Sequence, residues 1–244
     1  MDIKTRRSIR KYAKKDVTEE MITRLLSTAE HTQTMGNLQL YSVVETREGR
    51  MKEALSAAHF SQPMVCEAPV VLTFCADFRR NTVWAENRSA EPGYNNLLSF
   101  INGMTDALLY CQTFCNLAEE EGLGLCFLGT TIYQPKEIIR ILRLPRLVMP
   151  VATITVGWPD EHPNVSDRLP LEAILHHETF NDYTPEAIDR FYEMKEQLPE
   201  NRHFVEINHK QTLAQVFTDI RYTKKDNEVL SEGFIEALRQ QGFL

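Results

Sequence analysis

The sequence predicts a protein of alternating helices and strands built around one sizeable core. The apolar run VVLTFCA at residues 70–76 has the length and β-branched content of a strand buried on both faces. Residues 96–121 carry apolar side chains on more than one helical stripe, which is typical of a helix buried on several sides. With 244 residues, 43% of them apolar, the chain is long enough for one substantial core.

The elements before the long helix follow from capping residues and apolar spacing. A helix is expected to begin after Asp16 or Thr18, because either side chain can cap it and two acidic residues then suit its positive N-terminal end. A strand follows at 38–44, and a helix at 51–58 precedes the buried strand at 70–76.

The elements after the long helix are marked by glycine and proline. Gly122 ends that helix, and a strand follows at 123–128. Pro135 opens a further helix, and residues 149–156 form the last core strand. This gives four strands and about five core helices, followed by a tail of two or three polar helices.

A basic run near the N-terminus, RRSIRKY at residues 6–12, is the most informative local feature. Three guanidiniums and one hydroxyl around a single apolar side chain form a donor set able to grip an anion. In extended backbone, Arg6, Ser8 and Arg10 share one face, with Arg7 and Ile9 on the other. That face suits a phosphate and a polarised ring. The alternative is a solvated basic run with no ligand.

Composition argues against several classes of protein. The net charge of −7 argues against nucleic acid as the main partner. No apolar run reaches the ~18 residues that a membrane span requires, and no secretory signal is visible, so a cytoplasmic protein with no membrane partner is expected. The five cysteines are odd in number and lie mostly in apolar segments, which indicates core thiols; their spacing predicts no metal site.

The basic run closely resembles the N-terminal signature of the FMN-dependent nitroreductase family. Later segments, in the same order, resemble the larger NADPH-preferring nitroreductases and flavin reductases of that family. These segments are GLGL at 122–125 followed by Gly129, VGWP at 156–159, RLPL at 168–171 before HHE at 176–178, and a C-terminal helix ending in QGF at 241–243.

This resemblance covers nearly the whole chain and implies its architecture. The fold class is α+β, with a mixed, mostly antiparallel sheet between helices and a helical C-terminal extension. Residues 1–182 are expected to form the FMN-binding core and residues 183–244 the extension, as parts of the same domain. The resemblance also implies a homodimer that binds FMN in a groove at the dimer interface.

The resemblance assigns roles to the basic side chains. Arg6, Ser8 and Arg168 match the phosphate contacts of the family, and a phosphate of about −1.5 to −2 charge suits charged and hydroxyl donors. Arg10 matches the cation over the pyrimidine edge of the ring, where negative charge gathers on reduction.

Further positions are assigned around the ring, and two of them depart from the family pattern. Gln62 matches an amide on the N3 and O4 edge, and Gly129 with Thr130 matches the loop near N5. A second glycine is usual where this chain has Thr130. Ser166 stands where the subgroup has a lysine, so one phosphate cation is lost, and Lys4 and Arg7 are the candidates to compensate.

NADPH or NADH is the expected electron donor. The absence of a G-x-G-x-x-G motif argues against a Rossmann site for the nicotinamide. The resemblance implies that basic residues of the extension bind the 2′-phosphate of NADPH, and the candidates in the matching region are Arg202, His209 and Lys210. Because the paired arginines of the subgroup are not reproduced and lysine is a point charge, a preference for NADPH of only about tenfold is expected.

The predicted function is an FMN-dependent oxidoreductase that passes hydride from NAD(P)H to nitroaromatics, quinones or free flavin by a ping-pong mechanism. The flavin carries the chemistry, so no catalytic side chain is predicted. Two alternatives are a flavin-binding carrier or sensor without turnover, and an anion- or nucleic-acid-binding module that uses only the basic run. Four histidines are expected at the surface or an interface: His31, His59, His176 and His177.

Overall fold

The computed structural model describes residues 3–244, which form two compact units. The first unit holds the chain up to Asn164 together with Leu230–Leu244, and the second is Val165–Val229. The assignment of the whole chain to one domain, with a boundary after residue 182, stays a prediction.

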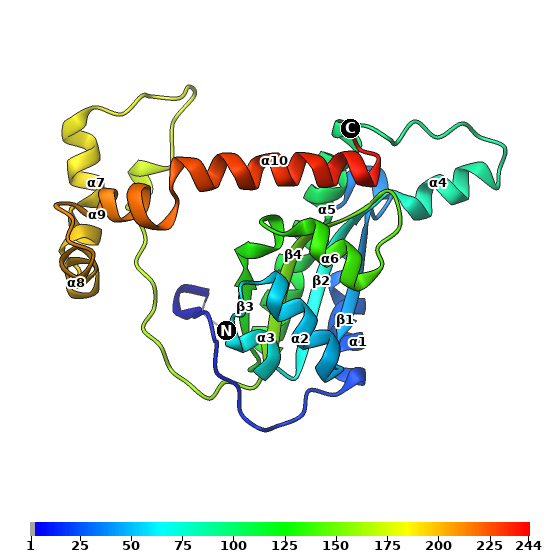
Figure 1. Cartoon of the computed structure of the whole chain (residues 1–244), viewed down its shortest axis with the longest axis horizontal. Helices are drawn as coiled ribbons and strands as arrows, with labels where there is room; N and C mark the ends of the chain where they lie inside the picture. Colours follow the sequence, from blue (N-terminus) through cyan, green and yellow to red (C-terminus); the bar gives the residue numbers. More distant parts are fainter. Residues whose placement is uncertain (1–2) are drawn as a thin grey trace. The chain divides into compact units, whose positions relative to one another are not determined.

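An antiparallel sheet of four strands lies at the centre of the first unit (Figure 1). Its two inner strands are buried along their full length, as expected for the apolar run at 70–76. In spatial order the strands are β1 (Tyr41–Thr46), β2 (Val70–Asp77), β4 (Val148–Gly157) and β3 (Gly124–Leu128).

Helices cover both faces of this sheet, so β2 contributes side chains to two hydrophobic clusters (Figure 1). Leu72 and Phe74 pack in the larger cluster with α1 and α5, whereas Val71 packs in the smaller one with α2, α3 and α6. The alternation follows from the two-residue period of a strand. The helices are α1 (Glu19–Ala29), α2 (Gly49–Ala58), α3 (Pro63–Glu67), α4 (Arg79–Glu86), α5 (Leu97–Glu120), α6 (Pro135–Leu142) and α10 (Lys224–Gln241), whose last turns belong to this unit.

The long helix is capped at both ends, and it ends before Gly122, as expected. The Asn96 side chain accepts a hydrogen bond from the Ser99 N–H, and Gly122 takes a φ of +86° just beyond the end of α5. The first strand was predicted to begin at residue 38 but begins at Tyr41. The reason is that Gln39 has a φ of 53°, in the left-handed region, which interrupts an extended strand.

The second unit is helical and has a small apolar core. Phe191, Leu213 and Val216 are among its buried apolar residues. Its elements are a 3₁₀ turn (Leu171–Ala173), α7 (Pro185–Gln197), α8 (Pro199–Ile207), α9 (Leu213–Val216), a π turn (Phe217–Arg221) and the first turns of α10.

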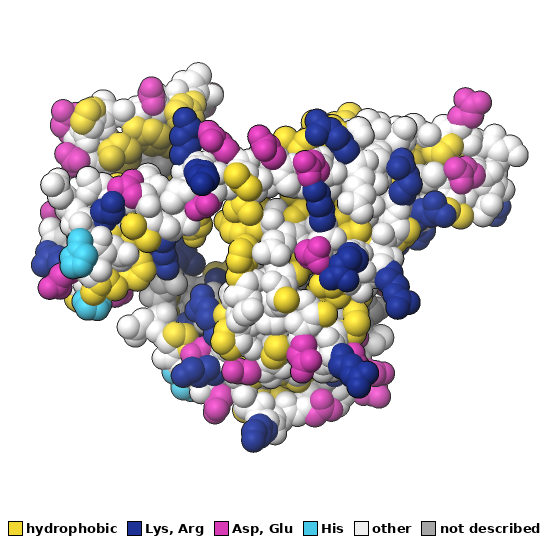
Figure 2. Space-filling model, viewed as in Figure 1, with side chains coloured by type: hydrophobic (Ala, Val, Ile, Leu, Met, Phe, Trp, Pro, Cys, Tyr) yellow, Lys and Arg dark blue, Asp and Glu magenta, His cyan; other side chains and the backbone are white. Residues whose placement is uncertain are grey.

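The surfaces carry charge of both signs. Figure 2 shows acidic and basic side chains interspersed over the visible face of each unit. Among residues 3–244, no helix combines the length and apolarity that crossing a bilayer requires. No group of three His, Cys, Asp or Glu side chains in the same range converges as a metal site would.

Candidate functional site

The basic N-terminal segment lies along the edge strand β3. The backbone N–H of Ile9 donates to the carbonyl of Leu125 at 2.9 Å, and Ser8 forms a parallel bridge with the same residue. Ile9 is 6% exposed, and its side chain occupies the space that a Cβ on Gly124 would fill at 2.7 Å. The Ser8 bridge is isolated and adds no strand to the antiparallel sheet, and the glycine explains how the segment approaches β3 so closely.

A second set of contacts fixes the other end of the segment. The hydroxyl of Tyr12 lies 2.7 Å from the carbonyl oxygen of Ile9 and 2.6 Å from Thr155 Oγ1, and burial raises the pKa of this phenol. The Glu161 carboxylate accepts hydrogen bonds from the backbone N–H of Arg10 at 2.5 Å and from that of the next residue at 3.1 Å. The backbone of the segment is therefore held while its basic side chains extend from it.

The three guanidiniums have few carboxylate partners. Arg6 Nη1 lies 3.8 Å from Glu119 Oε1, and within residues 3–244 no other ion pair involves these arginines. Burial raises the pKa of Glu119, and Arg6 acts against that shift. Arg7 Nε is buried without a hydrogen-bond partner, and Arg10 is exposed with its guanidinium beside the Cys126 thiol of β3. The surplus of positive donors fits an anionic ligand.

A second group of predicted residues meets where the chain turns after β3. Gly129 is exposed and opens a 3₁₀ turn over Gly129–Ile132, which contains Thr130. Gln62 Nε2 donates to Thr130 Oγ1 at 3.3 Å and to the carbonyl of His59 at 3.1 Å. His59 Nδ1 lies 2.8 Å from Thr130 Oγ1. The structure therefore brings Gln62 and Thr130 into direct contact.

The expectation that His59 lies at the surface or an interface is wrong. The residue is fully buried at the end of α2, where its backbone N–H caps the last turn. Phe60 and Ser61 follow with φ values of 57° and 56°, so the chain turns sharply without a glycine. Pro63 follows this turn as the first residue of α3. The contact between His59 and Thr130, 71 residues apart, follows only from the folded chain.

The environment of His59 keeps its ring neutral. Burial lowers its pKa from 6.5 to about 4, and Nε2 is buried with no hydrogen-bond partner. Near neutral pH one ring nitrogen therefore carries a proton and the other carries a lone pair.

The remaining predicted residues belong to the second unit. Arg168 is exposed, and its guanidinium donates to the carbonyl oxygens of Ser166 at 3.1 Å and Asp167 at 2.8 Å. These are bonds to its own neighbouring backbone, so the segment is compact around the guanidinium. The role of Arg168 toward a phosphate stays a prediction.

The candidates for the 2′-phosphate lie on α8 and in the turn that follows it. Arg202 is exposed and donates to Gln197 Oε1 at 3.3 Å, and His209 has a φ of 51° in the turn. Lys210 Nζ lies 2.9 Å from Asp219 Oδ2, and this contact lowers the pKa of Asp219. The Lys210 charge thus already has an intramolecular partner, which sequence spacing did not reveal.

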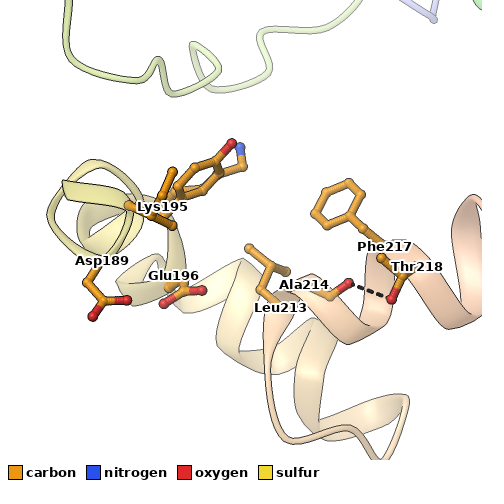
Figure 3. Close-up of a pocket in the computed structure, with 9 residues that line it drawn as sticks. Asp189, Lys195, Glu196, Leu213, Ala214, Phe217 and Thr218 are labelled. Carbon is orange, nitrogen blue, oxygen red and sulfur yellow. Dashed lines mark hydrogen bonds between the residues drawn. The ribbon is translucent and has the colours of Figure 1, made fainter. Parts of the chain in front are cut away.

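The second unit also contains a cavity of about 580 Å³ between α7 and the α9–π-turn segment (Figure 3). Leu213 and Phe217 point toward α7 across this space, while the lining cation Lys195 is paired with Asp167 at 2.9 Å. The cavity therefore favours an apolar group over a phosphate. Its lining residues are Ile188, Asp189, Tyr192, Lys195, Glu196, Leu213, Ala214, Phe217 and Thr218.

The first unit has a donor set that fits FMN. Its basic segment offers guanidinium and hydroxyl donors for a phosphate, and Arg10 lies near the C-terminal half of β3 beside Cys126. The Gln62–Thr130 pair follows at the turn after the same strand and offers polar atoms for a ring edge.

The chain is similar to known proteins in its sequence and in its fold. The sequence model of the nitroreductase family matches residues 3–158. FMN reductase [NAD(P)H] of Bacillus subtilis is 32% identical over 176 residues, which cover 71% of each chain. A Bacteroides fragilis protein of known structure is 59% identical over the full length of both chains, with a TM-score of 0.99. The structure of B. megaterium NfrA2 is 29% identical, with a TM-score of 0.85 over 99% of this chain and 96% of that one. From its sequence and its fold, the chain belongs to the nitroreductase family.

Proposed function

We propose that the chain carries FMN and reduces small acceptors, such as nitroaromatics, quinones or free flavin, with NADPH or NADH as the donor. The observation that carries this proposal is the basic segment fixed along β3, in which Arg6 alone of the three arginines has an ion pair within residues 3–244. The Bacillus subtilis relative is named an FMN reductase that uses NAD(P)H. A family of reductases favours an enzyme over a flavin carrier or sensor.

The phosphate of FMN is assigned to the basic segment. Arg6 and Ser8 supply a charged and a hydroxyl donor, and Arg7 has a buried Nε that lacks a partner among residues 3–244. Arg168 is proposed as the fourth contact. A dianionic phosphate needs several such donors, because each charge-assisted hydrogen bond contributes about 1.5–3 kcal/mol.

The ring is assigned to Arg10, Gln62 and the turn at Gly129 and Thr130. When bound, FMN supplies a ring that takes up hydride and passes on two electrons. Arg10 would place positive charge near the pyrimidine edge and so stabilise negative charge there. Gly129 has open space in place of a side chain, which leaves its backbone accessible.

The donor is assigned to the second unit, where Arg202, His209 and Lys210 are proposed to hold the 2′-phosphate. Lys210 would have to exchange its contact with Asp219 for the phosphate, and this competition is consistent with a modest preference for NADPH. One site serves donor and acceptor in turn, so ping-pong kinetics are expected.

A homodimer is proposed from the exposed apolar side chains of the long helix. A helix that is apolar on several sides but covered on only some of them needs a partner surface. Light scattering that shows a monomer with stoichiometric FMN would count against the interface. The exposed apolar residues of α5 are Leu97, Leu98, Ile101, Leu108 and Leu109.

The function is tested by anaerobic bleaching of the bound flavin. The purified chain is expected to be yellow, to lose its visible absorption on addition of NADPH, and to recover it when a quinone is added. Arg10→Ala should slow bleaching about ten- to hundredfold. Arg88→Ala, which alters an exposed arginine on another surface, is the matched control and should bleach at the normal rate.

Two other outcomes distinguish the alternatives. A protein that binds FMN but is not bleached by either nicotinamide is a carrier or sensor. A colourless protein that takes up no FMN is an anion-binding module, and the proposed function is then wrong.

A further inference from the structure

His59, Gln62 and Thr130 form a closed hydrogen-bonded group in the first unit. Each of the three side chains contacts at least one other, with the Thr130 hydroxyl at the centre. His59 is fully buried, whereas Gln62 and Thr130 are partly exposed. The group therefore has an interior side that the fold fixes and an exterior side that a ligand can meet.

The hydrogens of Gln62 are both used inside the group. Its Nε2 donates to the carbonyl oxygen of His59, which can only accept, so the orientation of the amide is determined. Its other amide hydrogen goes to Thr130 Oγ1. The side chain accordingly presents its carbonyl oxygen to the exterior, and Gln62 acts toward a ligand as an acceptor alone.

The tautomer of His59 decides what Thr130 presents. If Nδ1 accepted the Thr130 hydrogen, Nε2 would carry a hydrogen with no partner in a fully buried place. A buried donor without a partner is rare and costly, while a buried lone pair is better tolerated. We therefore assign the hydrogen to Nδ1, which then donates to Thr130 Oγ1.

The Thr130 oxygen then accepts two hydrogen bonds, one from His59 and one from Gln62. A hydroxyl has two acceptor positions and one hydrogen, so both acceptor positions are filled. Its own hydrogen has to point away from the two donors. Thr130 thus becomes a donor of fixed direction, and hydrogen bonds in such a chain strengthen one another.

We propose that His59 is a positioning residue that holds the Thr130 hydroxyl as a donor beside the Gln62 carbonyl oxygen, so that the pair recognises an imide edge of bound FMN. The proposal rests on the proposed function, because FMN supplies the imide. An imide has an N–H next to a carbonyl oxygen, and the donor–acceptor pair of Thr130 and Gln62 is complementary to that edge. Thr130 is then a contact in its own right, and the donor toward the imide carbonyl is a threonine hydroxyl in place of the Gln62 amide.

The binding experiment compares full-length variants by FMN affinity and by the midpoint potential of the bound FMN. Thr130→Val removes the hydroxyl at constant shape, and His59→Leu removes its partner. Each is expected to weaken FMN binding about three- to tenfold, as one net hydrogen bond implies, and to shift the potential. The double variant should bind no worse than Thr130→Val alone, because the two changes act through one interaction.

Two variants separate positioning from general packing. His59→Asn retains an N–H donor near the place of Nδ1 and should restore affinity and potential. Thr131→Val is the matched control, since this buried hydroxyl in the same turn donates to the Leu128 carbonyl and not to the group. It is expected to lower the melting temperature while the affinity for FMN stays at the wild-type value.

The position of the proton on the His59 ring gives an independent test that needs neither a variant nor an activity measurement. Nitrogen-15 NMR of the protein at neutral pH, recorded with and without added FMN, should show the His59 proton on Nδ1. A proton on Nε2 would overturn the proposal, and so would additive effects in the double variant or unchanged FMN affinity in Thr130→Val. If the wild-type protein itself fails to bind FMN, the proposed function fails instead, and the tautomer assignment is still decided by the NMR measurement.

Discussion

Acidification to pH 5 should destabilise this protein through one buried side chain, His59. Burial lowers the pKa of its ring from 6.5 to about 4 in the folded chain. Between these two values, the unfolded chain binds a proton that the folded chain does not. The free energy of unfolding therefore falls as the pH is lowered through this range, and the full contribution of the neutral ring is present above pH 6.5.

The size of the effect follows from the same two pKa values. A difference of about 2.5 pKa units corresponds to about 3 kcal/mol, and about 2 kcal/mol of this is lost by pH 5. Glu119 has the opposite effect, because burial raises the pKa of its carboxyl and the folded chain then gains a proton on acidification. A variant that changes only His59 isolates the histidine contribution from that of Glu119.

The assay is urea unfolding of wild type and His59→Asn at pH 7 and pH 5, at fixed protein and FMN concentrations. Asparagine does not titrate, so the wild type should lose about 2 kcal/mol more than the variant over this interval. The urea dependence of the unfolding free energy should be the same in both proteins. Equal losses in the two proteins would show that His59 is not held neutral by burial, and the reasoning would be refuted.

Three further perturbations test the site. Arg10→Ala should lower the midpoint potential of bound FMN and slow its reduction, with a smaller loss of FMN affinity than Arg6→Ala; an unchanged potential would remove Arg10 from the ring. Lys210→Ala should abolish a preference for NADPH of about tenfold in kcat/KM and leave NADH turnover almost unchanged, whereas an equal loss with both donors would show that Lys210 does not contact the 2′-phosphate. Gly124→Ala should weaken FMN binding, because its Cβ would lie 2.7 Å from the Ile9 side chain that anchors the basic segment; unaltered affinity would separate that anchor from the site.

The elements that were predictable are the ones whose signal is local. β2 follows from an apolar run and α5 from helical periodicity, and the C-terminal end of α5 follows from Gly122. The two short helices α3 and α4 were not predicted. α3 has only five residues, and α4 carries mostly polar side chains, so neither shows an amphipathic period over enough turns.

The candidate site was predictable in its residue types and not in its pairings. The alternation of Arg6, Ser8 and Arg10 indicated an anion-binding face, because side chains in extended backbone alternate. The partners of these basic residues come from distant parts of the chain. Glu119 lies at the end of α5 and contacts Arg6, and Asp219 follows α9 and contacts Lys210. Such contacts depend on how the elements pack, which spacing along the sequence does not encode.

The wrong prediction for His59 shows which information a family resemblance does not contain. The family pattern assigned roles to Gln62 and Thr130 but offered no reason to connect them with His59. The threonine is where the pattern is broken, and a hydroxyl there brings a hydrogen-bonding group that a glycine lacks. A partly buried hydroxyl needs hydrogen-bond partners, and the Thr130 hydroxyl has them in His59 and Gln62.

A neutral imidazole suits this position better than a cation would. A charged residue behind Thr130 would add to the field of Arg10, and the potential of a nearby ring would then respond to its protonation. His59 is neutral well below neutral pH, so its contribution to the site is one directed hydrogen bond with no net charge. The same burial that fixes this bond lowers stability in acid, because the unfolded ring is free to take up a proton. Loss of stability on acidification and a constant ring environment near neutral pH therefore have one physical cause.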